Sequence, residues 1–255
     1  MGSREQVESI MEPMDNLDTS VPSSTLNPPW SGGATAGFGV LILVVFFITQ
    51  FVASVAAVAF GGIDPSSNLG DLTAIAIIAS AVICTGLILS TLTGRYSVKT
   101  YLALQPVLLK TVGGWLFATI VFVLLGDRYI EWMERAAVPD FMIEVYTSAQ
   151  LMPVLWFSMI IAAPVFEEVL FRGFLYEGFR HSRLGVSGAI LIPTLIWTLL
   201  HASQYDVYYL SLIVLIGVLL GIARHRTGSL YVPLAMHVGN NLIATIQTMW
   251  ALGNG

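Results

Sequence analysis

The chain has 255 residues, of which 56% are hydrophobic and only 11% are charged, with a formal net charge of -5 at pH 7. A soluble domain usually carries about 25% charged residues, so this composition indicates a protein that crosses a membrane several times. No basic patch suggests a nucleic-acid partner, and the single cysteine, Cys84, excludes an intramolecular disulfide and a cysteine metal cluster.

Residues 1–35 are polar, acidic and rich in Ser, Pro and Gly. A segment of this composition cannot bury enough apolar surface to fold, so we expect a disordered acidic tail. It does not resemble a signal peptide, because no short apolar segment follows a basic start. Gly2 follows Met1, but Gln6 stands where the myristoylation pattern needs Ser or Thr.

The remainder, residues 36–255, is predicted to be one transmembrane helical domain of the all-α class. A spanning helix needs about 20 mainly apolar residues, and barrel strands would alternate instead. We expect a polytopic bundle of about seven helices, over residues 36–60, 72–92, 108–126, 151–177, 186–203, 207–223 and 230–252. The stretch 96–109 could instead form an amphipathic helix at the membrane interface.

Basic residues alternate between the ends of these segments, and cytoplasmic loops carry the excess of Lys and Arg. They follow the second, fourth and sixth segments, at Arg95, Lys99, Lys110, Arg180, Arg183, Arg224 and Arg226. The loops 61–71, 127–150 and 204–206 are acidic on balance. We therefore expect these basic ends and the N-terminal tail to be cytoplasmic and the C-terminus to be outside.

Small residues recur where helices should touch. Gly217 and Gly221 form a GxxxG pair, and the second segment carries Ala74, Ala76, Ala79 and Ser80. Such residues let helix backbones approach closely in a membrane and carry no chemistry.

The fourth segment carries Glu167, Glu168 and Arg172 within an otherwise apolar run. Charges at membrane depth are costly and mark functional sites. On a helix, Glu168 and Arg172 are four residues apart in the order that favours an ion pair. Glu167, rotated by about 100°, has no such partner and is left for another role. Alternatively, the helix ends here and all three groups lie in water.

His201 ends the fifth segment, one turn after Trp197. Glu167 and His201 are nearly equidistant in sequence from the turn near Arg183, so antiparallel helices would place them at similar depth, with Trp197 walling the site. Without this depth argument, the sequence around His201 would favour a histidine at the membrane interface.

The seventh segment contains His237 and Asn241, which share a helix face, with Gly239 between them. A buried histidine is often satisfied by a neighbouring backbone, but two polar residues on one face of an apolar helix point to a site. His181 and His225 lie among basic residues and are expected to be solvated.

These three motifs in this order resemble the CPBP family of CAAX proteases and bacteriocin-processing enzymes, also called the Abi family, which includes type II CAAX prenyl proteases. The resemblance covers a protease-like core, residues 152–246. The family usually has Phe where this sequence has Trp197. The resemblance implies an all-helical intramembrane endopeptidase with its active site in a cavity within the membrane. It also implies that Glu167 and His201 activate a water, that His237 and Asn241 hold the oxyanion, and that Glu168 and Arg172 support them.

Hydrolysis of a peptide bond needs a base, an oxyanion donor and an acid for the leaving amine, and this set can supply them. We expect no cofactor. Zinc held by Glu167, His201 and His237 is the metalloprotease alternative, although the HExxH spacing is absent. The expected partners are a membrane-associated protein or peptide substrate and the lipid bilayer, in the plasma (inner) membrane of a prokaryote. Two other functions stay open, namely a non-catalytic scaffold or bacteriocin-immunity-type factor of the same fold, and a transporter with a proton relay, although no inverted repeat is visible.

Overall fold

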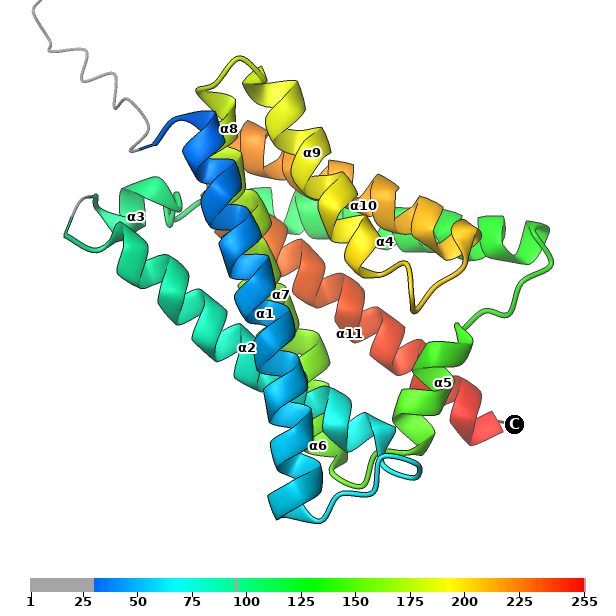
Figure 1. The fold of residues 1–255 in the computed structure, drawn as a ribbon. Coiled ribbons are helices and arrows are strands. Elements are labelled where there is room, and N and C mark those ends of the chain that lie inside the picture. Colours follow the sequence, from blue (N-terminus) through cyan, green and yellow to red (C-terminus); the bar gives the residue numbers. More distant parts are fainter. Residues whose placement is uncertain (1–29, 95, 255) are drawn as a thin grey trace, which may run out of the picture.

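A computed structural model describes residues 30–94 and 96–254, and within these ranges the chain forms helices and no strand (Figure 1). The all-α class is therefore confirmed. Most of the predicted disordered tail, residues 1–29, lies outside the described residues, as does Arg95. Helix α1 begins at Gly32, four residues before the predicted start, where the Ser31 hydroxyl caps it by accepting a hydrogen bond from the Ala34 N–H.

All seven predicted segments are helical, but fewer than seven have the length and composition of a membrane span. Five described helices do: α1 (Gly32–Gly61), α2 (Leu69–Leu92), α4 (Leu109–Trp132), the helix Met152–Arg180 and α10 (Val207–Thr227). Helix α9 (Gly185–Leu200) is apolar but has only 16 residues. Helix α11 (Tyr231–Asn254) has 24 residues but is interrupted by polar side chains, among them His237 and Asn241. The structure thus supports five spans by these measures.

Two short helices, α3 and α5, differ from what the sequence predicted. Helix α3 covers only Val98–Tyr101, so an amphipathic helix over residues 96–109 is wrong. The predicted loop 127–150 is also wrong in part, because α4 continues to Trp132 and α5 occupies Asp140–Thr147. Asp140 is the first residue of α5, where an acidic side chain interacts favourably with the helix dipole. Its buried Tyr146 shares a hydrogen bond of 2.7 Å with Thr245 of α11.

The helix Met152–Arg180 lies in the middle of the bundle and departs twice from α-helical geometry. Its parts are α6 (Met152–Phe157), the π-helical η2 (Ser158–Ala162), α7 (Ala163–Glu167), the π-helical η3 (Glu168–Leu175) and α8 (Tyr176–Arg180). In Figure 1, α7 passes behind α1 and between α2 and α11. Pro164, which has no N–H to donate, lies two residues after the end of η2 and gives a reason for the local change in hydrogen bonding. π-Helical turns are frequently found at functional sites.

Small residues let α9 and α10 pack closely, as the GxxxG pattern predicts. A Cβ atom on Gly217 would lie 2.7 Å from Thr194 and 3.2 Å from the Trp197 ring. A Cβ on Gly221 would lie 2.7 Å from Ile190. Both glycines are therefore needed to keep Trp197 and its helix in place.

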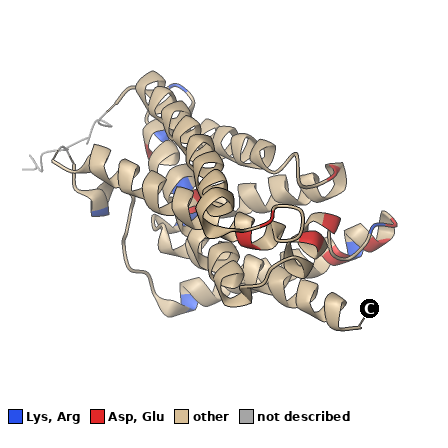
Figure 2. Cartoon of the chain, turned by 60° about the horizontal axis from the view of Figure 1, so that its bottom comes forward, with Lys and Arg blue, Asp and Glu red and all other residues tan. Residues whose placement is uncertain are grey.

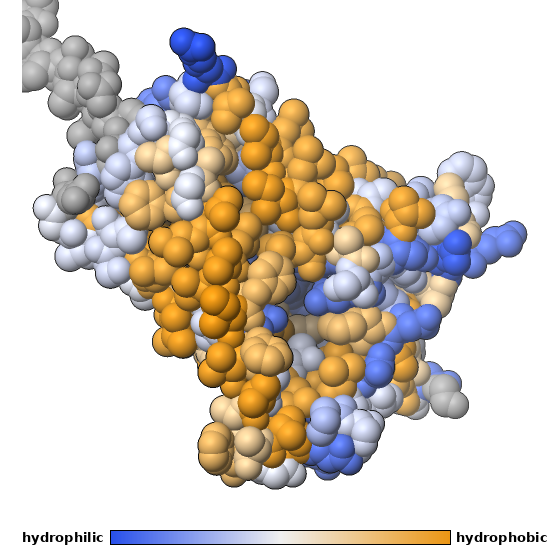
Figure 3. All heavy atoms as spheres, in the orientation of Figure 1, coloured by the Kyte–Doolittle hydropathy of each residue, from blue (hydrophilic) through white to orange (hydrophobic). Residues whose placement is uncertain are grey.

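The surface is apolar around the helices and charged at the two ends. Phe51 of α1 is 71% exposed and Leu109 of α4 is 87% exposed, and Figure 3 shows apolar side chains covering much of the face around α1. In Figure 2, most Asp and Glu residues lie in the half of the molecule that holds the C-terminus. These features fit an integral membrane protein. One basic residue predicted to lie in a cytoplasmic loop, Arg224, is instead buried within α10.

Candidate active site

The Glu168 side chain is at the centre of a buried polar network. It is fully buried, and its Oε1 accepts hydrogen bonds of 2.9 Å from Arg172 Nη1 and 2.9 Å from His237 Nδ1. Its Oε2 has no hydrogen-bond partner among the described residues. The predicted Glu168–Arg172 ion pair is therefore present, and its carboxylate also orients the His237 ring.

Arg172 has two further contacts with the helices that enclose it. Its Nη2 donates to the Gly217 carbonyl of α10 at 3.1 Å, and its guanidinium carbon lies 4.7 Å from the Trp197 ring centroid. A guanidinium over an indole face is a favourable cation–π arrangement. The cation is thus balanced by a carboxylate, a carbonyl and an aromatic face, which is how a buried charge is tolerated.

Glu167 lies on the other side of the helix and is more accessible than Glu168. Its side chain is 18% exposed, against 0% for Glu168. Its Oε2 accepts a short hydrogen bond of 2.5 Å from Trp197 Nε1 and lies 3.7 Å from His237 Nε2. The two adjacent carboxylates therefore have different environments: that of Glu168 is buried inside the protein, and that of Glu167 faces a cavity.

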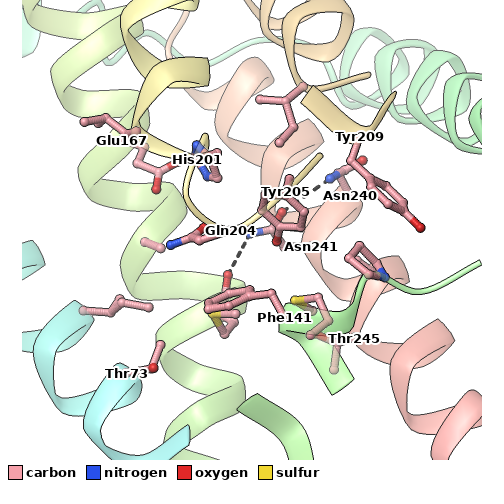
Figure 4. A pocket seen from close by; sticks show the side chains of 18 of the residues that line it. Thr73, Phe141, Glu167, His201, Gln204, Tyr205, Tyr209, Asn240, Asn241 and Thr245 are labelled. Carbon is pink, nitrogen blue, oxygen red and sulfur yellow. Dashed lines mark hydrogen bonds between the residues drawn. The ribbon is translucent and has the colours of Figure 1, made fainter. Parts of the chain in front are cut away.

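His201 is connected to Glu167 through Trp197. Its Nδ1 lies 2.8 Å from the Trp197 carbonyl oxygen. Because a carbonyl can only accept, this bond places the proton on Nδ1 and leaves Nε2 as the free nitrogen. Figure 4 shows His201 and Glu167 facing the same space, as the depth argument predicts.

Asn241 joins α11 to the first π-helical stretch. The Ala163 N–H bonds to the Ser158 carbonyl, so it is not available to Met159, and the next residue, Pro164, has no N–H. Asn241 Nδ2 donates to the Met159 carbonyl at 2.8 Å, which satisfies that oxygen. Its amide nitrogen keeps a second N–H for another acceptor.

The second π-helical stretch is secured in the same way. The Tyr176 N–H bonds to the carbonyls of Phe171 and Gly173 and not to that of Arg172. Arg224 Nε of α10 donates to the Arg172 carbonyl at 3.0 Å. The fixed shape of the glutamate-bearing helix therefore depends on side chains from α10 and α11.

A cavity of about 620 Å³ adjoins these residues. The predicted residues that line it are Glu167, Trp197, His201, His237 and Asn241, whereas Glu168 and Arg172 stay behind its wall. Figure 3 shows a hollow with polar atoms between α1 and the end of α9. Further lining residues come from α1, α2, α4 and α5, including Phe46, Ser80, Asp127 and Phe141.

Tyr205 is a cavity residue that the sequence motifs did not identify. It lies just past α9, and its ring centroid is 6.0 Å from that of His201. Burial raises the pKa of its phenol, and the nearby Glu167 charge raises it further, so the group stays protonated and able to donate. Its spacing of four residues from His201 is the signal that could have indicated it.

The donor arrangement does not fit the three-ligand zinc site considered from sequence. Within residues 30–94 and 96–254, no three His, Cys, Asp or Glu side chains come together as a metal ligand set. Glu167 Oε2 lies 3.7 Å from His237 Nε2, but within the described residues His201 does not join them as a third ligand.

Of the two remaining histidines, both predicted to be solvated, His181 is exposed and lies 3.3 Å from Glu177. His225 is exposed but belongs to α10, and its Nδ1 lies 2.9 Å from the Tyr176 hydroxyl. Neither reaches the cavity.

Comparison with known proteins agrees with the resemblance seen in the motifs. Residues 149–243 match the model of the type II CAAX prenyl endopeptidase Rce1-like family. This confirms the similarity to CAAX-type proteases over the region that carries all three motifs. A protein of Escherichia coli described only as an uncharacterized 24.3 kDa protein is 27% identical over 147 residues, which is 55% of this chain and 67% of that one. No solved structure matches.

Proposed function

We propose that the protein is an intramembrane endopeptidase that hydrolyses a peptide bond in a membrane-associated protein or peptide, of CAAX type or related. The observation that carries the proposal is the position of Glu167. It is a carboxylate presented to a cavity, beside two histidines and an asparagine, in a region similar to a family of CAAX-type endopeptidases.

In the proposed reaction, Glu167 takes a proton from a water in the cavity, and the water oxygen attacks the carbonyl carbon. His201, with its Nε2 directed away from the Trp197 carbonyl, helps to orient that water. The carbonyl oxygen becomes an oxyanion, which accepts hydrogen bonds from Asn241 and from protonated His237. The tetrahedral intermediate then collapses, the C–N bond breaks, and the proton held by Glu167 passes to the leaving amine.

Glu168 and Arg172 act indirectly in this proposal. Glu168 fixes the His237 ring through Nδ1, so that Nε2 faces Glu167 and the cavity. The two residues are therefore positioning residues, and substrate does not touch them.

Glu167→Gln tests the proposal, because glutamine keeps the shape and still accepts from Trp197 but cannot take a proton. Loss of a general base typically lowers the rate by about 10²–10⁴-fold. We expect new protein N- and C-termini in membranes of wild-type cells to be absent from cells with Glu167→Gln at equal protein level. Glu144→Gln on α5, outside the cavity lining, is the matched control. Wild-type cleavage by purified Glu167→Gln protein would overturn the assignment and favour a non-catalytic scaffold.

Chelation tests the metal alternative separately. Because the described residues offer no three-ligand set, we expect purified protein to retain its cleavage rate after treatment with a strong zinc chelator. A loss of activity that added zinc restores would show instead that a metal takes part.

A further inference from the structure

The cavity lining carries two carboxylates, those of Glu167 and Asp127, and within the described residues no Lys or Arg lines it. The two histidines at the cavity belong to the Glu167 end. Asp127 therefore presents a second carboxylate that the proposed reaction does not use.

Asp127 lies on α4, five residues before its end, and is half-buried. Its Oδ2 accepts a hydrogen bond of 3.0 Å from Gln247 of α11. The bases nearest in sequence are engaged elsewhere, since Arg128 pairs with Glu131 at 2.6 Å and Arg135 lies 3.8 Å from Asp206. No described Lys or Arg pairs with Asp127, so a cation in the cavity would find it available.

The surroundings of the cavity add to this charge. Its lining includes Pro139, which precedes α5, and Tyr209 of α10. Acidic residues lie close to both in the chain, since Asp140 and Glu144 belong to α5 and Asp206 caps α10. A cleft lined by charge of one sign concentrates ligands of the opposite sign.

Resting on the proposed peptidase function, we propose that the cavity selects a peptide segment with a basic side chain, which Asp127 binds. This specifies the substrate class: a membrane-associated peptide that carries a lysine or arginine within reach of Asp127.

Binding to the Glu167→Gln protein measures this recognition without cleavage. The probes are fluorescent apolar peptides in detergent, N-acetylated and C-amidated, in which a single lysine replaces norleucine at each position in turn. We expect lysine at one or two positions to lower Kd by about tenfold, the size of one charge-assisted hydrogen bond. Adding Asp127→Asn should remove that gain, while its side-chain oxygen still accepts from Gln247. Adding Asp140→Asn, an exposed acid on α5, should leave the gain unchanged.

Two results would overturn the proposal: lysine tightening binding at no position, or the gain persisting with Asp127→Asn. Cleavage of the norleucine peptide by wild-type protein tests the peptidase function on its own. Lysine-dependent binding without cleavage would support recognition of a basic side chain by Asp127 and contradict the proposed peptidase function.

Discussion

Trp197 makes three different contacts in the structure, whereas the sequence predicted only that its ring would line the site. Its Nε1 donates to Glu167, its carbonyl accepts from His201, and its ring lies beside the Arg172 guanidinium. The contact between His201 and the residue 197 carbonyl uses the backbone and does not depend on the side chain. The Nε1–H that donates to Glu167 is present only in tryptophan. A phenylalanine, usual in the family that the chain resembles, could not make the bond to Glu167.

Trp197→Phe should therefore lower kcat and leave KM nearly unchanged. It removes one hydrogen bond to a charged group, worth about 1.5–3 kcal/mol, while keeping an aromatic ring over Arg172. We expect a loss of about 10–100-fold in kcat, measured on purified protein with a peptide substrate. Trp250→Phe is the control, because Trp250 is 73% exposed at the far end of α11. An unchanged kcat would show that the indole N–H does not position Glu167.

At the scale of elements, the helix Met152–Arg180 fixes both carboxylates through its neighbours. Arg224 and Asn241 satisfy carbonyls at its two π-helical stretches, and Gly217 accepts from Arg172. Without Asn241 the Met159 carbonyl would lose this donor, and a buried acceptor left without a partner costs about 1–3 kcal/mol. The geometry of the site is thus a property of three helices together.

Glu168→Gln should mainly reduce stability, because it leaves Arg172 without its anion. Breaking a buried ion pair costs about 3–5 kcal/mol. The double change Glu168→Gln with Arg172→Met should recover part of the loss, seen as a higher thermal midpoint in detergent than for the single change. Cleavage should stay low in both, because neither keeps a carboxylate behind His237. A double variant no more stable than the single one would show that the two charges do not compensate each other.

The sequence allowed prediction of the helices and of a group of neighbouring polar residues, but not of the hydrogen bonds that join them. Apolar runs located all seven helices, helix depth placed Glu167 near His201, and the family resemblance added His237 and Asn241; in the structure all four line one cavity with Trp197. The π-helical turns were not visible, because the exchange of hydrogen bonds near Pro164 depends on Asn241, 77 residues away along the chain (241 minus 164). The bond between Glu168 and His237 likewise joins residues 69 apart. Such long-range contacts leave no local pattern.

At the scale of the whole molecule, charge is divided between the two ends. In Figure 2 most acidic residues lie in the half that holds the C-terminus, while most Lys and Arg residues lie in the other half. Burial of Arg224 removes one base from the predicted cytoplasmic set, but exposed Arg226 remains. The cavity adjoins the acidic end, so orientation decides from which side a substrate arrives.

Cysteine labelling in intact cells tests that orientation, since the native Cys84 is fully buried and should not react. We expect Ala136→Cys and Asn254→Cys to react with a membrane-impermeant maleimide from outside. His181→Cys should react only after permeabilisation, because basic loops stay cytoplasmic. All three positions are exposed, and none of the changes removes a Lys or Arg that sets the topology. External labelling at His181 with protection at Ala136 would reverse the orientation and place the cavity mouth on the cytoplasmic side.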